Sequence, residues 1–481
     1  MPTKRRPAHA HDRLARPGDA ANSISVLLRD RIPALLQQCP ESERPRGRGR
    51  PPLVSAQRLW GAVLQAMLHG FKSQLDVWRV VISDASGDPR LAKLSDMAIY
   101  QRLARMPPSA FSHCFEQLTA RFTGFLKAGR AVKSPAFATG IYALDQTVLD
   151  PVCSRLKLMR DLPKGHHDLL AGAVGCLFDL QRQLWVKVKF SENSMQNEKP
   201  AALELIQGLP QRSLLIFDLG YFSFAWLDAL QERTLYFISR LPQKVTCQEI
   251  HKICTSKNAR VRLCESLVYL GATKGTGACQ AAYPVRLVEI TRRKFPGKDS
   301  PEDETWRYVT NQLDPRELPA KELAALYGRR WDIEMALKLC KTELNLHLIW
   351  SAHANVIQHQ LFATLFLAQV VQVLRFEIAE QAGVPCCEVS VELMLRWLPQ
   401  YLSAGVDGIE RFIRDGRHLG FIRPFRGIEY DVPRPRTKRY DLPPEWPPQR
   451  RAIYSGHKRG SPQRKQQDRL NALLASGARA A

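Results

Sequence analysis

The sequence predicts a mixed α/β fold, with a central sheet between two helical regions. Three observations support this prediction. Apolar side chains recur at helical spacing over residues 54–130, apolar runs typical of strands alternate with helical segments from residue 137 onwards, and helical spacing returns after residue 351. The chain has 481 residues, of which 45% are hydrophobic. It is therefore long enough for about two to four domains.

The N-terminal part is predicted to be a disordered tail followed by a helical DNA-binding domain. Residues 1–22 are basic and polar and lack the apolar run of a secretory signal. Residues 23–135 are predicted to be helical, with a first helix over 23–40 and further helices over 54–130. Ser95 is expected to be an N-cap, because its hydroxyl can accept a hydrogen bond from the first helical turn.

The sheet is predicted to lie in residues 136–242 and 307–351. Three strands, a helix, a strand, a helix and a further strand follow one another in the first of these ranges, which is typical of a mixed α/β sheet. Residues 243–306 contain further strand-like runs and are predicted to be a β-rich insertion of antiparallel strands. After the insertion, residues 327–351 predict one helix, with the sequence YGRRWDIEMALKLCKTELNLHLIWS.

The C-terminal part is predicted to be a helical region followed by a basic tail. Residues 352–428 show helical spacing. Their most apolar stretch, residues 361–374, is too short to span a bilayer and contains Gln369 and Gln372, so a buried helix is expected. Residues 429–481 are rich in Arg, Lys and Pro and are predicted to be an extended tail that buries little surface.

The charge of the chain indicates a polyanionic partner. The formal net charge is +24, which favours nucleic acid, although a ribosomal or membrane-surface protein would have a similar charge. The eleven cysteines form no C-x2-C pair, and Cys247, His251 and Cys254 alone do not make a zinc site. Reduced thiols in a cytoplasmic protein are the better interpretation.

Three carboxylates are candidate ligands for a divalent cation. Asp145 lies within the first predicted strand, Asp218 follows the fourth, and Glu334 lies in the helix after the insertion. Carboxylate oxygens are the ligands that Mg²⁺ prefers, and two such ions can promote the in-line displacement of a phosphoryl group. Each residue also has a structural interpretation, since Asp145 could be a turn residue and Asp218 could cap the following helix.

The helix predicted over 327–351 has an unusual polar edge. At about 100° per residue, Tyr327, Arg330, Glu334 and Lys341 fall on one side, next to an apolar stripe that includes Ile333 and Leu344. Asp332 and Glu343 are expected to point into solvent. A surface helix with paired charges would explain the pattern without any function. A helix that faces the core on one stripe and a nucleic acid on the next would explain it as well.

These residues carry a resemblance to a known family. The segments ALDQTVLD, with Asp145, and IFDLGYFS, with Asp218, resemble the first two motifs of the DDE transposases of bacterial insertion sequences, in the group named after insertion sequence four. The third motif resembles its signature Y-x2-R-x3-E-x6-K, matched by Tyr327, Arg330, Glu334 and Lys341. Gln146 is a departure, because many relatives have Gly there.

The resemblance implies an RNase H-like core with Asp145, Asp218 and Glu334 as catalytic and metal-binding residues. It implies two Mg²⁺ ions, which Mn²⁺ could replace. It also implies cutting of transposon-end DNA by water and attack of the freed 3′-hydroxyl on target DNA. The implied protein is a homodimer on paired ends in the bacterial cytoplasm, associated with the nucleoid and not with a membrane.

Several basic residues are candidate DNA contacts. The resemblance implies phosphate contacts for Tyr327, Arg330 and Lys341, and Arg240 and Lys244 end the strand before the insertion and could bind DNA near the cut. Arg48-Gly49-Arg50 is similar to an AT-hook, which fits a narrow minor groove, with a basic linker as the alternative. A basic loop could bind phosphate or remain solvated; its residues are Lys157, Arg160, Lys164, His166 and His167.

Three functional hypotheses follow. The chain is expected to be an active transposase. The alternatives are a nuclease that cuts without joining, and a DNA-binding protein with an inactive RNase H-like core. The complete set of Asp145, Asp218 and Glu334 argues against the inactive core.

Overall fold

The computed structural model describes residues 53–83, 90–91, 93–126, 134–151, 170–195, 198–272, 278–292, 304–403, 407–424 and 440–454, and all structural statements below concern these residues. Several expectations fall outside them. These are the tail over 1–22, the helix over 23–40, the candidate minor-groove residues Arg48 and Arg50, the basic loop from Lys157 to His167 and most of the tail after 429.

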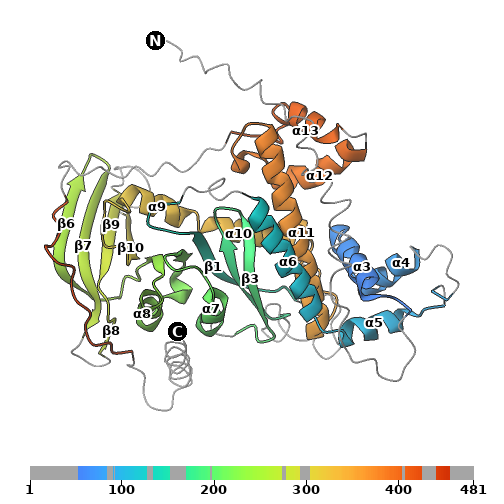
Figure 1. Cartoon of the computed structure of the whole chain (residues 1–481), viewed down its shortest axis with the longest axis horizontal. Helices are drawn as coiled ribbons and strands as arrows, with labels where there is room; N and C mark the ends of the chain where they lie inside the picture. The colour runs from blue at the N-terminus through green and yellow to red at the C-terminus, as the bar shows by residue number, and fades with distance from the viewer. Residues whose placement is uncertain are drawn as a thin grey trace, which may run out of the picture.

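A mixed sheet forms the centre of the molecule, which confirms the predicted α/β fold (Figure 1). The strand order is β3-β2-β1-β4-β5-β10-β9-β7-β6, and β8 pairs with β7. The strands of the first half are β1 (Ile141–Val148), β2 (Ala173–Asp179), β3 (Leu184–Ser191), β4 (Leu214–Phe217) and β5 (Tyr236–Arg240). The strands of the second half are β6 (Cys247–Lys257), β7 (Val261–Ala272), β8 (Cys279–Gln280), β9 (Val285–Arg292) and β10 (Glu304–Thr310).

The first half of the sheet combines an antiparallel meander with two parallel strands. β1, β2 and β3 pair antiparallel, whereas β4 pairs parallel with β1, and β5 pairs parallel with β4. The parallel connections run through α7 (Glu198–Ile206) and α8 (Phe224–Glu232). All four residues of β4 are buried, as expected for a central strand that is covered on both faces.

The predicted insertion over 243–306 contains the expected antiparallel strands, but they continue the same sheet. β10 pairs antiparallel with β5 through Tyr308 and Arg240, and with β9 on its other side. β7 joins β9 to the edge strand β6. The hydrogen-bonded ladder therefore runs without interruption from the meander to the outermost strand.

Helices cover both faces of the sheet. Successive side chains of β1 point to opposite faces of the sheet, so Ala143 lies in one hydrophobic core and Leu144 lies in another. The core on the Leu144 face is closed by α7 and α8. The core on the Ala143 face is larger and includes α9 (Ala320–Gly328), α10 (Trp331–Lys338) and the N-terminal helices.

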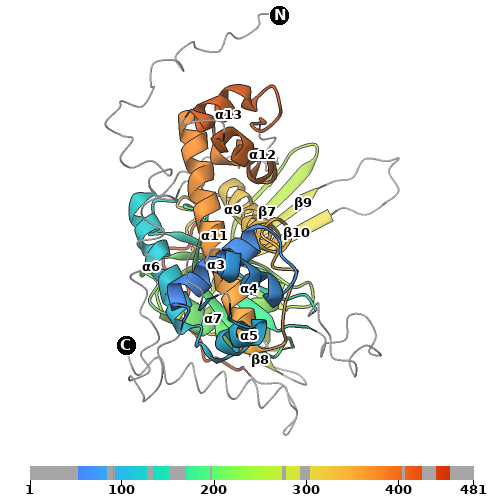
Figure 2. The same ribbon diagram turned by 90° about the vertical axis from the view of Figure 1, so that its right-hand side faces the viewer.

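The predicted N-terminal helices pack on one long helix of the C-terminal region (Figures 1 and 2). They are α3 (Ala56–Leu68), α4 (Gln74–Ser83), α5 (Asp96–Arg105) and α6 (Ser109–Phe125). Ser95 caps α5, because its hydroxyl accepts a hydrogen bond from the backbone of Ala98. The long helix is α11 (Ala354–Gln381), which contacts α3, α5, α6 and β3.

Helix α11 is long and apolar enough to cross a membrane, but it is a core helix here. Its most apolar window has a mean hydropathy of 1.6, and 78% of that window is buried inside the protein. Gln369 lies fully buried on it and bonds the backbone of Trp185 in the edge strand β3. This agrees with the buried helix predicted over 361–374.

The C-terminal region ends in two short helices and an extended segment. The helices are α12 (Val391–Ser403) and α13 (Gly408–Gly416). Residues 440–454, called the C-terminal strap below, run along the outer strands of the sheet. Asp441 donates its backbone N–H to Ile253 in β6, and Ile453 forms a bridge with Gln280 in β8. This part of the predicted tail is extended, as expected, and is attached to the sheet.

Candidate active site

The first two candidate carboxylates lie on neighbouring parallel strands. The register of β1 and β4 pairs Leu144 with Phe217, so the next residues, Asp145 and Asp218, follow side by side. Leu144 and Phe217 belong to the core closed by α7 and α8. Because side chains alternate between the faces of a strand, Asp145 points to the opposite face, towards α10.

Asp145 is half-buried at the centre of a charged group. One of its carboxylate oxygens accepts a hydrogen bond from the backbone N–H of Gln146, at 2.9 Å. The pKa of Asp145 is raised to about 6, mainly by burial, with smaller contributions in the same direction from the carboxylates of Asp218 and Glu334, while Gln146 and Arg330 oppose this change. These mutual effects place Asp218, Glu334 and Arg330 within electrostatic reach of Asp145.

Asp218 performs the capping role that the sequence left open. Its Oδ1 accepts a hydrogen bond from the backbone N–H of Gly220, at 2.9 Å, at the start of the short 3-10 helix η5 (Leu219–Tyr221). Capping fixes the direction of the carboxylate beside Asp145. The capping and the catalytic interpretations are therefore compatible.

The prediction of one helix over 327–351 was wrong. Helix α9 ends at Gly328, α10 begins at Trp331, and a π-helical turn, η6 (Leu339–Glu343), follows α10. The break falls at Arg329 and Arg330, whose side chains each reach forward to an acid of α10. π-Helical turns occur often at functional sites.

Glu334 is held by Arg330 across one turn of α10. The Arg330 Nη1 donates a short hydrogen bond to Glu334 Oε1, and the two side chains are 14% and 32% exposed. The Arg330 guanidinium also lies 5.4 Å from the ring centre of Trp331, which is 59% exposed. The Arg330 Nε is buried and has no hydrogen-bond partner among the described residues.

Tyr327 and Arg240 lie at the same site. Burial raises the pKa of the Tyr327 phenol, and the charges of Arg330 and Arg240 oppose this while Asp218 adds to it. The ring of Tyr327 packs against Tyr308, with 5.2 Å between the ring centres. Since Tyr308 is the register partner of Arg240, the edge between β5 and β10 brings both residues next to Asp218.

Asp332 was expected to point into solvent, and this was wrong. Its carboxylate accepts a hydrogen bond from Gln183 Nε2, at 2.8 Å, and pairs with Arg329 Nη2, at 2.5 Å. Its side chain is only 16% exposed. Glu343 is half-buried as well. The expectation failed because the helical wheel does not show that the turn between β2 and β3 covers this side of α10.

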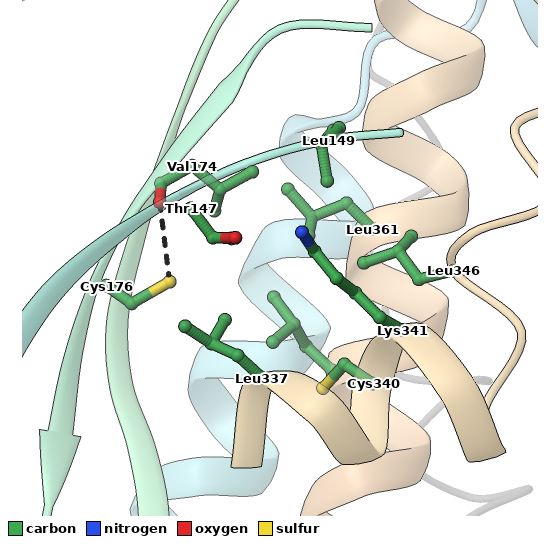
Figure 3. Close-up of a pocket in the computed structure, with 10 residues that line it drawn as sticks. Thr147, Leu149, Val174, Cys176, Leu337, Cys340, Lys341, Leu346 and Leu361 are labelled. Carbon is green, nitrogen blue, oxygen red and sulfur yellow. Dashed lines mark hydrogen bonds between the residues drawn. The ribbon is translucent and has the colours of Figure 1, made fainter. Parts of the chain in front are cut away.

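Lys341 binds the end of β1. Its Nζ donates a hydrogen bond to the backbone carbonyl of Val148, at 2.7 Å. Its aliphatic stem lines a small apolar pocket together with Cys176, Cys340, Thr147 and leucines of α11 (Figure 3). Cys176 is the register partner of Asp145, so this pocket lies directly beside the candidate site.

The remaining candidate contacts are less closely placed. Lys244 is exposed in the loop between β5 and β6. Arg48 and Arg50 lie outside the residues that the structure describes.

The three carboxylates fit a hard divalent cation in their chemistry, since Mg²⁺ prefers carboxylate oxygens. Among the described residues, however, no three His, Cys, Asp or Glu side chains are already arranged to hold a metal ion. The contacts of two carboxylates explain this, because Glu334 is bound by Arg330 and one oxygen of Asp218 is bound by Gly220. Joint binding of a cation would require the Glu334 side chain to leave Arg330.

Comparison with known families identifies part of this region. Residues 167–370 match the family model described as Transposase DDE domain. The matched segment contains Asp218 and Glu334 and begins after Asp145. This segment is therefore similar to a transposase DDE domain.

Two individual proteins are similar to the chain. A Sinorhizobium fredii (strain NBRC 101917 / NGR234) protein described as "Putative transposase y4zB" is 29% identical over 154 residues. The match covers 31% of this chain and 39% of that protein. The piggyBac transposase in a synaptic complex with hairpin DNA has 8% identity, with 84% of this chain and 85% of that chain covered and a TM-score of 0.37. A likeness this low does not establish a shared fold.

Sequence reasoning missed two residues at this site. The sequence analysis did not single out Gln183, and it expected Asp332 to point into solvent. The only local signal was the spacing of Arg329 and Asp332, which allows an ion pair across one helical turn. No local signal connects Gln183 with Asp332, because they are 149 positions apart in the chain.

Proposed function

We propose that the chain is a DNA transposase of a bacterial insertion sequence that uses Asp145, Asp218 and Glu334 as its catalytic carboxylates. The observation that carries the proposal is that three separate segments of the chain meet at this place: the register of β1 and β4 sets Asp145 beside Asp218, and α10, which carries Glu334, packs on β1. The match of residues 167–370 to a transposase DDE domain supports it. The order β3-β2-β1-β4-β5, with only β2 antiparallel to its neighbours β1 and β3, supports the RNase H-like core.

Asp145, Asp218 and Glu334 would together hold Mg²⁺, or Mn²⁺ in its place. Bound divalent cations stabilise the negative charge on the attacking and leaving oxygens of a phosphoryl transfer. Arg330 and Arg240 would bind phosphate oxygens on the two sides of the cut, with Tyr327 donating its hydroxyl between them. Lys341 would hold β1, and with it Asp145, through Val148, and its positive charge would attract the backbone of the DNA.

The proposed reaction has two steps. The oxygen of a water molecule bonds to the phosphorus at the transposon end, the bond from phosphorus to the 3′-oxygen breaks, and the 3′-oxygen takes up a proton. The freed 3′-hydroxyl then attacks a phosphorus in target DNA. A bond forms from the transposon 3′-oxygen to this phosphorus, the bond from the phosphorus to the target 3′-oxygen breaks, and the target 3′-oxygen takes up the proton that the attacking hydroxyl loses. The proposed working form is a homodimer on paired transposon ends, in the bacterial cytoplasm and associated with the nucleoid. Lys244 would add a contact to the DNA backbone, and Arg48 and Arg50 would add contacts in the minor groove.

An inactive DNA-binding protein is the second candidate. The ion pair that Glu334 forms with Arg330 favours it, because a carboxylate held by a guanidinium is occupied. A nuclease that cuts without joining is the third, and it shares the site of the first.

The test uses linear DNA that carries the sequences flanking the gene on both sides. The purified full chain is incubated with this DNA and Mg²⁺, with Glu334→Gln as the control, and the nicked strands are sequenced. The proposal expects nicks at one defined position, lost in Glu334→Gln, followed by strands joined to an added plasmid. Binding without nicks would favour the inactive protein, and nicks without joining would favour the nuclease.

A further inference from the structure

Helix α10 is attached to the sheet on both sides of Glu334. Before Glu334, Asp332 accepts a hydrogen bond from Gln183 Nε2, at 2.8 Å, in the turn between β2 and β3. After Glu334, Lys341 in the following π-turn donates to Val148, at 2.7 Å, at the far end of β1. The segment that carries Glu334 therefore lies along β1, with one polar attachment at each end.

Gln183 lies in the turn between β2 and β3, and hydrogen bonds within this turn hold it in place. Gln183 is 7% exposed and has a φ of 56°, a left-handed conformation that is uncommon for residues other than glycine. Its amide also donates to the carbonyl of Leu180, at 3.0 Å. Asp179 accepts hydrogen bonds from the backbone N–H groups of Gln181 and Arg182, at 2.8 and 3.0 Å. The Gln183 amide is thus held by its own turn before it meets α10.

The Asp332 side chain is only 16% exposed, and a neighbouring arginine balances its negative charge. Asp332 pairs with Arg329 at 2.5 Å through Oδ2, the same oxygen that accepts the hydrogen bond from Gln183, so its charge is neutralised. Because the first turn of α10 contains both Asp332 and Glu334, a shift of Asp332 moves the backbone of Glu334 with it. The polar contacts of Asp332 are made with the sheet and with Arg329, and none is made with Asp145 or Asp218.

We propose that Gln183 and Asp332 are positioning residues that set the place of Glu334 above Asp145. This rests on the proposed function, because it assigns Glu334 to a shared divalent-cation site. Residues behind metal ligands orient them, and their loss typically weakens metal binding by about 10- to 100-fold. A residue with a purely structural role would lower the melting temperature without this selective effect on the cation.

The test measures Mn²⁺ binding to the full chain without DNA, by electron paramagnetic resonance at 25 °C, together with the melting temperature. Glu334→Gln defines how much of the affinity depends on Glu334. Gln183→Gly removes the amide and keeps the left-handed turn, since glycine adopts a positive φ freely. We expect Gln183→Gly and Asp332→Ala each to weaken Mn²⁺ binding about 10-fold. The double variant should be no weaker than Asp332→Ala alone, because both changes remove the same contact.

Thr234→Gly is the matched control. Thr234 is exposed, has a φ of 57° and lies between α8 and β5, so its change to glycine should leave Mn²⁺ binding unaltered. Native affinity in Gln183→Gly, or losses that multiply in the double variant, would overturn the inference. If Glu334→Gln and Asp145→Asn bind Mn²⁺ as well as the native chain does, the proposed site itself fails, which is a different outcome.

Discussion

Arg330 and Glu334 form an ion pair across one turn of α10, at the centre of the candidate site. The carboxylate of Glu334 therefore has one oxygen committed to a guanidinium. Arg330 in turn has a buried Nε without a hydrogen-bond partner among the described residues. A DNA phosphate that engaged Arg330 would release Glu334 for a cation, so the pair connects the two binding events.

The first prediction concerns this ion pair. Arg330→Gln should strengthen Mn²⁺ binding to the DNA-free chain by about 5-fold, because the cation no longer competes with a guanidinium for Glu334 and no longer meets its positive charge. The same change should reduce nicking, because a phosphate contact is lost. Titration with Mn²⁺ and the nicking assay measure the two effects. Arg316→Gln, which breaks an exposed pair with Asp314, should change neither. Weaker Mn²⁺ binding in Arg330→Gln would contradict the idea that Mn²⁺ and the Arg330 guanidinium compete for Glu334.

The second prediction concerns the pKa of Asp145, which burial raises from 3.8 to about 6. Between these pH values the folded, metal-free protein binds more protons than the unfolded chain, so its free energy of unfolding falls as the pH rises through 6. A shift of two pKa units corresponds to about 3 kcal/mol at neutral pH. Asp145→Asn should therefore stabilise the metal-free protein at pH 7 by up to about 3 kcal/mol, and by almost nothing at pH 4.

Thermal unfolding in a chelator at both pH values checks this prediction. Asp314 is the control with the opposite sign, because its hydrogen bonds from Arg316 lower its pKa. Its stabilising effect is lost only as the pH falls below 3.8 through the lower folded pKa, so Asp314→Asn should destabilise the protein at both pH 4 and pH 7. Equal effects of Asp145→Asn at pH 4 and pH 7 would show that this carboxyl does not titrate as described.

The third prediction concerns the C-terminal strap. Tyr454 donates its hydroxyl proton to Asp228 Oδ2, at 2.7 Å, and Asp228 is 2% exposed on α8. Tyr454→Phe should lower the free energy of unfolding by about 1.5 kcal/mol, since a hydrogen bond to a buried charge is lost. Tyr283→Phe makes the same chemical change nearby and should cost less. Denaturant titration compares the two variants, and an equal loss in both would argue against a specific role of Tyr454.

The fourth prediction compares two buried glutamines of α11. The amide of Gln369 bonds both the N–H and the C=O of Trp185, at 3.1 and 2.9 Å, and also Thr119 Oγ1, at 2.7 Å. Gln369→Leu should cost about 3 kcal/mol, because buried groups of the edge strand lose their partners. Gln372 lies one turn further on, and its Oε1 has no partner among the described residues. Gln372→Leu should therefore be neutral or stabilising, and unfolding experiments that gave similar losses for both variants would refute this difference.

Much of the fold could be predicted from local sequence patterns. The fully buried strand at Leu214–Phe217 is a continuous apolar run, and the N-cap at Ser95 is a single-residue signal. Such patterns also placed Asp145 in a strand and Asp218 after one. They did not reveal that the insertion continues the same sheet, because the pairing of Tyr308 with Arg240 joins strands 68 positions apart, and no local pattern specifies it.

The details of the candidate site were harder to predict. A helical wheel assumes one continuous helix, whereas the chain breaks at Arg329 and Arg330 and forms a π-turn at Leu339–Glu343. The π-turn carries Lys341, which donates a hydrogen bond to Val148, 193 positions away in the chain, and no local pattern specifies such a contact. The sequence did not reveal that the C-terminal strap is attached to the sheet either. Its composition is that of a solvated tail, whereas Ile453, Arg450 and Tyr454 attach its end to the outer strands and to α8.

The uninterrupted ladder from β5 to β10 limits how the protein could close around a duplex if it binds DNA as proposed. A hinge needs residues that are free to rotate, and here the joint between the meander half and the outer strands is a row of paired backbone groups. DNA lying on the outer strands would keep a constant distance from the aspartates during the reaction. Any clamping motion must then come from the helices that flank the sheet.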